Sequence, residues 1–226
     1  TGEEIEKVKY QDVLNMLFSE KKIHIDELNN IYDYSNYIAE VDLAKELASL
    51  LKDERSVDGI KKYDSDEIEK IFTKIKKESH IEFSKEQEEA ILMAFTEPIV
   101  IITGGPGTGK TTIVHAILKM YLRLNGDNST LAESIALLAP TGRAAKRLKE
   151  STNMNASTIH KFLGYQGENY FEYSKTNKTS ARLIIVDEAS MMDLPLASRL
   201  ITSMHDDARL IIVGDVDQLP SVGPGQ

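Results

Sequence analysis

Four short apolar runs constrain the fold of this chain of 226 residues more than any other feature. The runs occupy residues 98–103, Ile135–Ala139, Leu183–Val186 and 210–213. They are apolar throughout instead of alternating with polar residues, which is typical of strands that are buried on both faces. Such strands form parallel sheets that helices cover on both sides, so we expect an α/β fold from Ser84 onward.

A glycine-rich segment follows the first apolar run. Residues 104–111 read Gly-Gly-Pro-Gly-Thr-Gly-Lys-Thr and match the pattern G-x-x-x-x-G-K-[ST], and a helical pattern over Lys110–Leu124 comes next. The glycines let successive backbone N–H groups turn inward around phosphates, and the start of the helix adds the positive end of its dipole. A glycine turn that binds nothing is the alternative, which the lysine, the threonine and the flanking elements disfavour.

We therefore predict a P-loop that binds ATP with Mg²⁺. Lys110 would neutralise the β- and γ-phosphates, and the Thr111 hydroxyl would hold the metal ion. The other predicted contacts to the nucleotide are Gly105, Pro106, Gly107, Thr108, Gly109 and Thr112.

Two carboxylates, Asp187 and Glu188, end the third apolar run, 77 residues after Lys110. In P-loop nucleoside triphosphatases an acidic residue at such a strand end completes the Mg²⁺ site, and a neighbouring glutamate can activate the attacking water. We expect Asp187 to be a metal ligand and Glu188 to be the general base. A strand end without a catalytic role is the alternative, but the P-loop in the same chain favours the functional interpretation. Glu188 in turn favours a hydrolase over a small-molecule kinase.

Four segments resemble motifs of superfamily 1 DNA helicases. Residues 187–192 (Asp-Glu-Ala-Ser-Met-Met) and 214–222 (Gly-Asp-Val-Asp-Gln-Leu-Pro-Ser-Val) are similar to motifs II and III, and residues 139–148 look like motif Ia. Residues 157–165 look like the next DNA-contacting motif. The resemblance covers about 83–225 and is to the RecD/TraA type, which includes the exodeoxyribonuclease V alpha subunit and moves 5′ to 3′ on single-stranded DNA. It implies a RecA-like motor domain of an ATP-dependent helicase that acts in DNA repair and recombination.

The resemblance also implies roles for single residues. Gln87 falls where the family reads adenine, although its position also suits a capping box with Ser84. Gln218 would couple to the γ-phosphate, and Asp215 would be a structural hydrogen-bonding residue. The predicted DNA contacts are Thr141, Arg143, Lys146, Thr158 and His160. For the basic residues Arg143, Lys146 and Arg147 a solvated helix face is the alternative, although their place after a parallel strand favours DNA. His160 is equally compatible with a buried histidine.

The charge distribution leaves room for a DNA partner. The net charge of −9 alone argues against nucleic-acid binding. Residues 1–90 carry all of it, with 14 basic and 23 acidic residues, whereas residues 141–182 hold 8 basic and 3 acidic ones, a local +5. Single-stranded DNA therefore remains a predicted partner.

Three regions are expected along the chain. Residues 1–52 read as a helix at 5–18, a hairpin around Asn29-Asn30 and a helix at 36–51, similar to part of a winged-helix module. A small acidic packing domain with no DNA contact is the favoured alternative, because no basic recognition helix is visible. Residues 1–52 are also a candidate surface for protein partners. Residues 53–83 would be a linker and a helix that Asp64 and Glu67 open, and residues 84–226 the motor domain. A hairpin insertion near 165–180 is also expected, with Tyr170, Phe171 and Tyr173 exposed. The resemblance implies that such an insertion parts or guides DNA strands, and an ordinary surface loop is the alternative.

The composition excludes several other classes. The chain has no cysteine, which rules out disulfides and thiolate metal sites and suits a reducing cytoplasm. No apolar run approaches the roughly 18–20 residues of a membrane helix, so we expect no membrane partner. No apolar segment of a signal peptide follows Glu3, Glu4 and Glu6, so we expect a cytoplasmic protein. The sequence has no His-x-x-x-His pair, so nothing in it indicates a zinc site.

The sequence ends directly after the segment that resembles motif III. The family needs a second motor domain whose arginines complete the ATP site, contacts worth on the order of 10³–10⁵ in rate. We expect this chain alone to bind Mg-ATP weakly, to hydrolyse it slowly and not to unwind DNA. A regulatory or assembly ATPase with a protein-binding N-terminal module is the alternative function, and a winged-helix regulator with a vestigial nucleotide site is a third, which the acidity of residues 1–60 disfavours.

Overall fold

The computed structural model describes residues 2–52, 60–126, 129–167, 170–215, 217–218 and 221–225. Within them, five parallel strands form the main sheet in the order β3 (Ile99–Thr103), β9 (Arg209–Gly214), β8 (Leu183–Val186), β4 (Ile135–Ala139) and β5 (Ala156–Thr158). The prediction of a parallel α/β sheet is therefore confirmed. The four apolar runs are four of these strands, and β5 is an addition that the apolar pattern does not indicate because it reads Ala-Ser-Thr.

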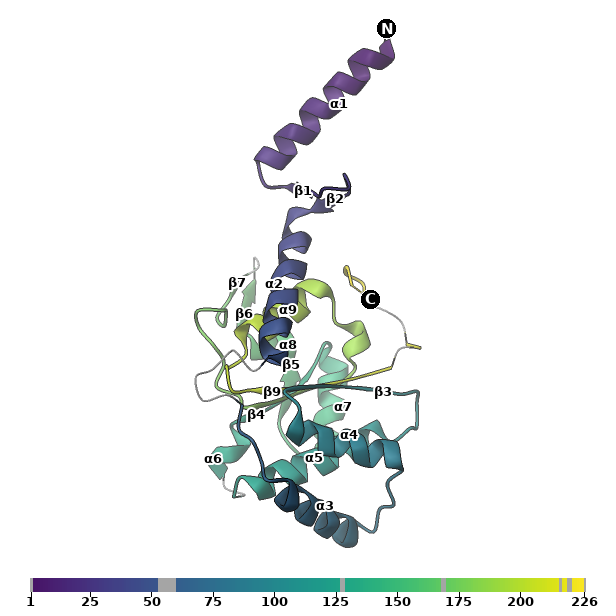
Figure 1. The fold of residues 1–226 in the computed structure, drawn as a ribbon, viewed down its shortest axis with the longest axis vertical. Coiled ribbons are helices and arrows are strands. Elements are labelled where there is room, and N and C mark those ends of the chain that lie inside the picture. Colours follow the sequence, from purple (N-terminus) through teal and green to yellow (C-terminus); the bar gives the residue numbers. More distant parts are fainter. Residues whose placement is uncertain are drawn as a thin grey trace.

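Two cores on opposite faces of the sheet explain why the apolar runs are continuous. Leu183 and Ile185 of β8 point into one core, and Ile184 and Val186 point into the other, so the strand is completely buried. Helices α3 (Ser65–Ser79), α4 (Lys85–Thr96), α5 (Lys110–Leu124) and α7 (Gly142–Thr152) contribute to the first core. Helices α2 (Tyr34–Leu51), α8 (Ile159–Phe162) and α9 (Leu194–Ser203) pack on the second. Figure 1 shows α3, α4 and α5 below the sheet and α2 and α9 above it.

The N-terminal elements follow the predicted order of helix, hairpin and helix. They are α1 (Gly2–Ser19), β1 (Ile23–Ile25), β2 (Ile31–Asp33) and α2. The antiparallel pair β1–β2 turns at Asn29, which has a φ of 61°, and the Asp26 carboxylate accepts hydrogen bonds from the backbone N–H groups of Leu28 and Asn30. The short turn thus has its own local hydrogen bonds.

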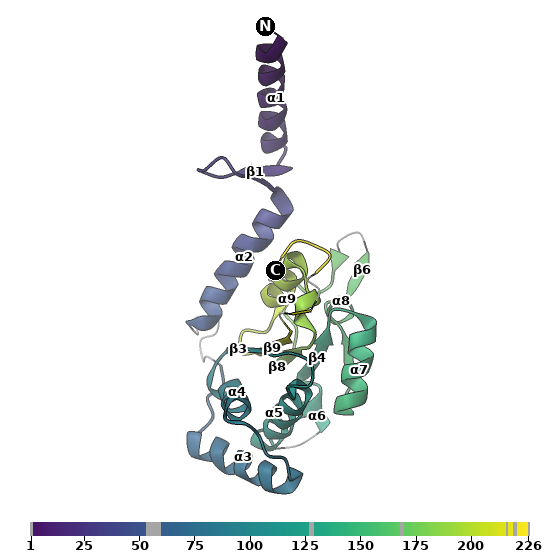
Figure 2. The same ribbon diagram turned by 90° about the vertical axis from the view of Figure 1, so that its right-hand side faces the viewer.

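Helices α1 and α2 differ in how much of them is buried. Helix α2 lies along α9, where Leu50 is buried and Glu46 forms an ion pair with Lys175 at 2.8 Å. Helix α1 projects away from the sheet, and its apolar residues Tyr10 and Met16 are at least half exposed (Figures 1 and 2). The winged-helix interpretation and the division of the chain at 52 and 84 stay predictions.

The segment that leads into α3 is fixed to the sheet by one buried guanidinium. Residues 53–59 of the predicted linker lie outside the described residues. Arg209 at the start of β9 is 4% exposed and donates to the backbone carbonyls of Glu97 and Lys61, both at 2.6 Å. Lys61 in turn donates to the side-chain oxygen of Asn125 at 2.7 Å. Arg209 therefore joins three separate segments of the chain.

Both helix starts that the sequence indicates are present. Asp64 caps α3 and accepts from the backbone N–H groups of Asp66 and Glu67. Ser84 and Gln87 form a complete reciprocal capping box at the start of α4.

The predicted hairpin exists, but it is shorter and less exposed than expected. Its strands are β6 (Tyr165–Gly167) and β7 (Tyr170–Phe171), and they pair in an antiparallel manner. Tyr170 is exposed as predicted, whereas Phe171 and Tyr173 are partly buried against the second core. The expectation that all three rings are exposed is therefore wrong: the Phe171 ring packs on Tyr165 and beneath the guanidinium of Arg199 on α9.

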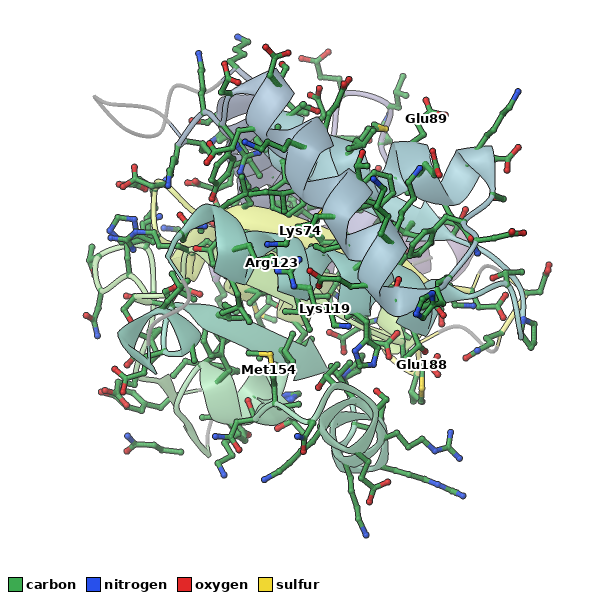
Figure 3. The ribbon with its side chains drawn as sticks, turned by 90° about the horizontal axis from the view of Figure 1, so that it is seen from below. Lys74, Glu89, Lys119, Arg123, Met154 and Glu188 are labelled. Atoms are coloured by element: carbon green, nitrogen blue, oxygen red, sulfur yellow. The ribbon has the colours of Figure 1, made fainter. Side chains whose placement is uncertain are left out.

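A cluster of basic side chains lies on the face that α3 and α5 form. Figure 3 shows Lys74, Lys119 and Arg123 close together, with Glu188 apart from them. A hydrogen bond from Arg123, together with the charges of the three basic residues, holds the pKa of the Glu78 carboxyl below its usual range.

No helix in the described ranges is long and apolar enough to cross a membrane.

We expect Arg209→Met to lower the free energy of unfolding by about 2–4 kcal/mol, because the carbonyls of Glu97 and Lys61 lose their buried donor. Arg199→Met is the matched control, since Arg199 is exposed and contacts the Phe171 ring at 5.1 Å; its loss should cost about 0–1 kcal/mol. Urea denaturation followed by circular dichroism measures both. A loss below about 1 kcal/mol for Arg209→Met would contradict this role.

Candidate nucleotide-binding site

All candidate functional residues lie at one edge of the sheet. Because the five strands are parallel, their carboxyl ends share this edge, which is where such sheets bind ligands. The P-loop follows β3, Asp215 and Gln218 follow β9, and Asp187 and Glu188 follow β8. The candidate DNA contacts Thr141 and Thr158 stand at the ends of β4 and β5. The nucleotide candidates thus occupy three adjacent strands, and the DNA candidates occupy the next two.

The backbone of the P-loop needs glycine at two positions. Gly107 has a φ of 76° and Gly109 a φ of 84°, both in the left-handed region that side chains disfavour. A Cβ atom on Gly109 would lie 2.6 Å from Nε2 of Gln87, whereas nothing lies within 4 Å of a Cβ atom placed on Gly105 or Gly107. The loop is therefore closed toward α4 and open on the side of Gly105 and Gly107.

The start of α5 is free to receive an anion. Its N-cap is Gly109, which has no side chain to cap the helix, and within the described residues no side-chain cap is seen at this helix start. Pro106 and Thr111 are exposed at this end, and Thr112 is half-buried. An uncapped helix start beside an open glycine loop is the arrangement that binds phosphate groups.

Lys110 and Thr108 are held by carbonyls of the loop itself. The Lys110 ammonium donates to the carbonyl oxygens of Gly104 and Gly105, the second at 2.9 Å. The Thr108 hydroxyl also donates to the Gly105 carbonyl, at 2.9 Å. The Lys110 ammonium is half-buried in this position and can exchange these carbonyls for phosphate oxygens.

Asp187 is held in place by backbone hydrogen bonds and lies within the electrostatic field of Lys110. Its N–H donates to the Leu138 carbonyl, and its carboxylate accepts from the Glu188 N–H, both at 2.9 Å. Burial raises the pKa of the Asp187 carboxyl above its usual range and the charge of Glu188 adds to this, while the Glu188 N–H and the Lys110 ammonium oppose it. The carboxylate of Asp187 and the hydroxyl of Thr111 are the hard oxygen ligands that suit Mg²⁺, which binds through one or two protein oxygens together with phosphates.

Glu188 has an unusual backbone conformation. Its φ of 53° is in the left-handed region, where it caps the 3₁₀ turn η1 (Ala189–Met191). Such strain in a residue other than glycine is typical of functional sites. Its half-buried side chain lines a pocket of about 270 Å³ that Gln218 and Arg143 also line.

Gln218 is tied to Asp215. The Gln218 N–H donates to the Asp215 carbonyl at 3.2 Å, and its side-chain amide lies 3.5 Å from the Asp215 carboxylate. Asp215 is 1% exposed and also accepts from the Asp217 N–H at 3.0 Å. The expectation that Asp215 is a structural hydrogen-bonding residue agrees with this geometry.

Gln87 connects α4 to the P-loop. Its side-chain oxygen accepts from the Ser84 N–H at 3.0 Å, and its side-chain nitrogen donates to the Thr108 carbonyl at 2.9 Å. The second bond, across 21 residues, was not foreseen from the sequence. Both ends of the amide are engaged, so an adenine contact would replace one of these bonds.

The DNA candidates divide into two groups. Thr141 and Thr158 cap α7 and α8 and accept from the N–H groups of Ala144 and Lys161 at 3.2 Å each, which leaves both hydroxyl protons free to donate. Arg143 lines the pocket beside Glu188, whereas Lys146 lies 3.8 Å from Glu150 on the same helix.

His160 is exposed, so the alternative of a buried histidine is wrong. Its ring lies 5.4 Å from that of Tyr165 and 6.1 Å from that of Phe171. The short helix α8 turns it outward beside the hairpin, while the preceding Ile159 fills the core.

The sequence groups Arg147 with Arg143 and Lys146 as basic residues near the predicted DNA contacts, and the structure adds a contact that this grouping does not give. Arg147 lines the same pocket as Arg143 and Glu188. Its spacing agrees with this position, because residues four apart share one helix face.

Comparisons with known proteins identify the family. A family model described as an AAA domain matches residues 87–224. The chain is 39% identical over 142 residues to the ATP-dependent RecD2 DNA helicase of Deinococcus radiodurans, covering 63% of this chain and 19% of that protein. It is 35% identical over 159 residues to the RecBCD enzyme subunit RecD of Mycolicibacterium smegmatis, covering 62% and 29%. The chain belongs to the RecD-like superfamily 1 helicases.

The match covers only part of each curated relative. This RecD-like chain spans less than a third of the length of either curated relative. Among solved structures, the crystal structure of Pif1 helicase from Candida albicans matches with a TM-score of 0.46 and 26% identity, over 63% of this chain and 34% of that one.

We expect Asp187→Asn to raise the melting temperature of this RecD-like chain in Mg²⁺-free buffer near pH 8 by about 2–4 °C, the shift that roughly 1 kcal/mol gives at this size. The raised pKa means that ionising Asp187 costs more in the folded than in the unfolded state. The gain should shrink as the pH is lowered toward the ordinary aspartate pKa of about 3.9, because the folded wild type then takes up the proton.

Asp217→Asn is the control for this test, since Asp217 is exposed; it should change the melting temperature by less than about 1 °C. Adding Mg-ATP should reverse the order of wild type and Asp187→Asn, because only the wild type keeps the metal ligand. A lower melting temperature for Asp187→Asn without Mg²⁺ would contradict the inferred cost of this carboxylate.

Proposed function

We propose that this chain is the ATP-binding motor part of an ATP-dependent DNA helicase or translocase that moves 5′ to 3′ on single-stranded DNA. The observation that carries the proposal is the order of the sheet edge, where nucleotide candidates end β3, β9 and β8 and DNA candidates end β4 and β5. The relatives named as RecD2 DNA helicase and RecBCD subunit RecD support the same activity.

On the nucleotide side, the loop N–H groups and Lys110 bind the phosphates of ATP. Thr111 and Asp187 hold Mg²⁺, which supplies charge neutralisation to the transferred phosphoryl group. Glu188 takes a proton from the attacking water, and the Gln218 amide reaches the γ-phosphate from the neighbouring strand end. Gln87 keeps the loop in register with α4 and contacts the adenine when nucleotide binds.

On the DNA side, Thr141 and Thr158 donate to backbone phosphates at two adjacent strand ends. Arg143, Lys146 and His160 add donors and positive charge, in a region with a surplus of basic residues. The exposed ring of His160, beside Tyr165, offers a surface for a base, and stacking is worth roughly 1–3 kcal/mol per base.

A second motor domain belongs to the same proposal. Its arginines would complete the ATP site, and protein partners would bind through residues 1–52. The length of the relatives, more than three times this chain's matched part, supports a larger assembly. We place this protein in the cytoplasm, where its DNA substrate would be found.

The deciding experiment is ATP hydrolysis by the full-length protein with and without single-stranded oligonucleotide. We expect stimulation of at least about 10-fold, and Lys110→Ala should lower kcat/KM for ATP by about 100-fold or more because the phosphates lose their main counter-charge. Lys119→Ala, on the same helix but far along it, should stay within about 2-fold. Hydrolysis that ignores DNA would instead favour the regulatory ATPase.

Salt dependence tests the DNA assignment separately. About three phosphate contacts give a slope near −2 for log affinity against log salt concentration, at roughly −0.7 per contact for single strands. Arg143→Gln should reduce the slope by about 0.7, and Lys77→Gln on α3 should leave it unchanged. Fluorescence anisotropy with labelled oligonucleotide measures it, and a flat salt titration would overturn the DNA assignment.

A further inference from the structure

A cavity of about 490 Å³ lies between the N-terminal elements and the start of α9. One of its walls includes Tyr32 of β2 and, from the first two turns of α2, Tyr37 and Glu40; the other includes Leu194 and residues 224–225. Pockets of roughly 300–1,000 Å³ are the size that binds ligands. None of the nucleotide or DNA candidates lines this cavity, so it is separate from the site at the sheet edge.

The wall on the α9 side is held in place by hydrogen bonds. The Leu194 N–H donates to the Pro224 carbonyl at 2.7 Å. The Ser221 hydroxyl lies 3.0 Å from the carbonyl oxygen of Gly223 and 3.1 Å from that of Gly225. An occupant therefore meets a wall that is already formed, which lowers the entropy that binding costs.

Two half-buried tyrosine rings line the other side. The ring centroids of Tyr32 and Tyr37 are 6.0 Å apart, with their planes inclined by 44°. The ring of His24 stacks on that of Tyr37 at 3.6 Å, and the Tyr32 hydroxyl donates to the Asp26 carboxylate at 3.0 Å. His24 and Asp26 do not line the cavity, so they support the two rings from outside it. Aromatic rings attract cations that lie within about 6 Å of the ring centroid.

The charged groups among the described lining residues are all acidic. They are Asp33 and Glu40, both exposed, and neither forms an ion pair with a described residue. Hydrogen bonds from the Ser35 hydroxyl and the Asn36 N–H hold the pKa of the Asp33 carboxyl below its usual range, so it is ionised at neutral pH. Residues 23–46 hold six acidic residues and one lysine. The surroundings of the cavity therefore favour a cation.

We propose that this cavity binds an arginine side chain of a protein partner, with the guanidinium between the two tyrosine rings and the carboxylates of Asp33 and Glu40. This inference rests on the proposed function, in which protein partners bind through residues 1–52, and it names the chemistry of that partner. Two carboxylates attract any cation, but the rings select a planar one, because a guanidinium stacks on aromatic faces and an ammonium does not. Since α2 and residues 224–225 both line the cavity, the partner would tie the N-terminal elements to the motor domain.

The experiment measures binding of a fluorescent pentapeptide with two arginines between glycines to this chain of 226 residues, by anisotropy. Matched peptides carry lysine or citrulline in place of arginine, and citrulline keeps the planar shape without the charge. The variants are Glu40→Gln, Tyr37→Leu and Tyr37→Phe, which keeps the ring. Glu27→Gln is the control, because Glu27 is exposed, does not line the cavity and loses the same charge. Thermal melting verifies that each variant is folded.

We expect the wild type to bind the arginine peptide at least about 5-fold more tightly than the lysine peptide and to show no saturable binding of the citrulline peptide. Glu40→Gln should weaken binding of the arginine peptide about 3- to 10-fold, because the guanidinium loses a charged acceptor. Tyr37→Leu should weaken it about 2- to 5-fold, and Tyr37→Phe should bind as the wild type does. Glu27→Gln should stay within about 1.5-fold.

Equal losses for Glu40→Gln and Glu27→Gln would mean that net charge alone attracts the peptide, and would overturn the cavity as its site. Equal affinity for lysine and arginine, or unchanged binding by folded Tyr37→Leu, would overturn the selection of a guanidinium by the rings. Self-association of the wild type in light scattering that Glu40→Gln abolishes would replace the partner by a second copy of this chain.

Peptide binding is measured without ATP and DNA, so its failure is distinguishable from that of the proposed function. Hydrolysis by the full-length protein that ignores DNA would overturn the helicase proposal and leave the cavity intact. An arginine peptide that does not bind would overturn the cavity and leave the helicase proposal intact.

Discussion

Parallel pairing of completely buried strands is the constraint on which the rest of this structure depends. Residues of β4 and β8 alternate between two hydrophobic cores, so both faces of the sheet must be covered and the chain must return by a helix after each strand. That connection rule brings every strand to the same edge at its carboxyl end. The P-loop, the acidic pair and the capping threonines meet there although more than 50 residues separate the first from the last.

The order of the strands places the nucleotide candidates on one half of the sheet edge and the DNA candidates on the neighbouring half. The nucleotide candidates stand on β3, β9 and β8, and the neighbouring β4 and β5 carry groups suited to backbone phosphates. At the boundary between them, where β8 pairs with β4, the Asp187 N–H donates to the Leu138 carbonyl.

Local signals in the sequence predicted much of this arrangement. The P-loop, the capping box of Ser84 and Gln87 and the four apolar strands depend on neighbouring residues alone, and each appears where expected. Strand β5 was not predicted because three residues of mixed polarity form a strand only when β4 is beside them. The burial of Phe171 was missed for a similar reason, since α9, more than 20 residues later, provides its contact.

The candidate site was predicted by residue type but not by contacts. Asp187 and Glu188 could be recognised from their place after an apolar run. The bond from Gln87 to Thr108 and the position of Arg147 beside Glu188 could not, because both depend on how elements distant in sequence pack. Helix periodicity places Arg147 on the face of Arg143 but does not say what that face meets.

Several features of the site oppose the stability of the fold. Asp187 is a carboxylate whose ionisation burial disfavours, Glu188 has a strained backbone, and the first turn of α5 has no capping side chain. The first and the last of these costs would be relieved by one ligand, because a metal ion would neutralise the carboxylate of Asp187 and phosphate oxygens would accept from the N–H groups in the first turn of α5. A site built in this way gains stability when its ligand binds.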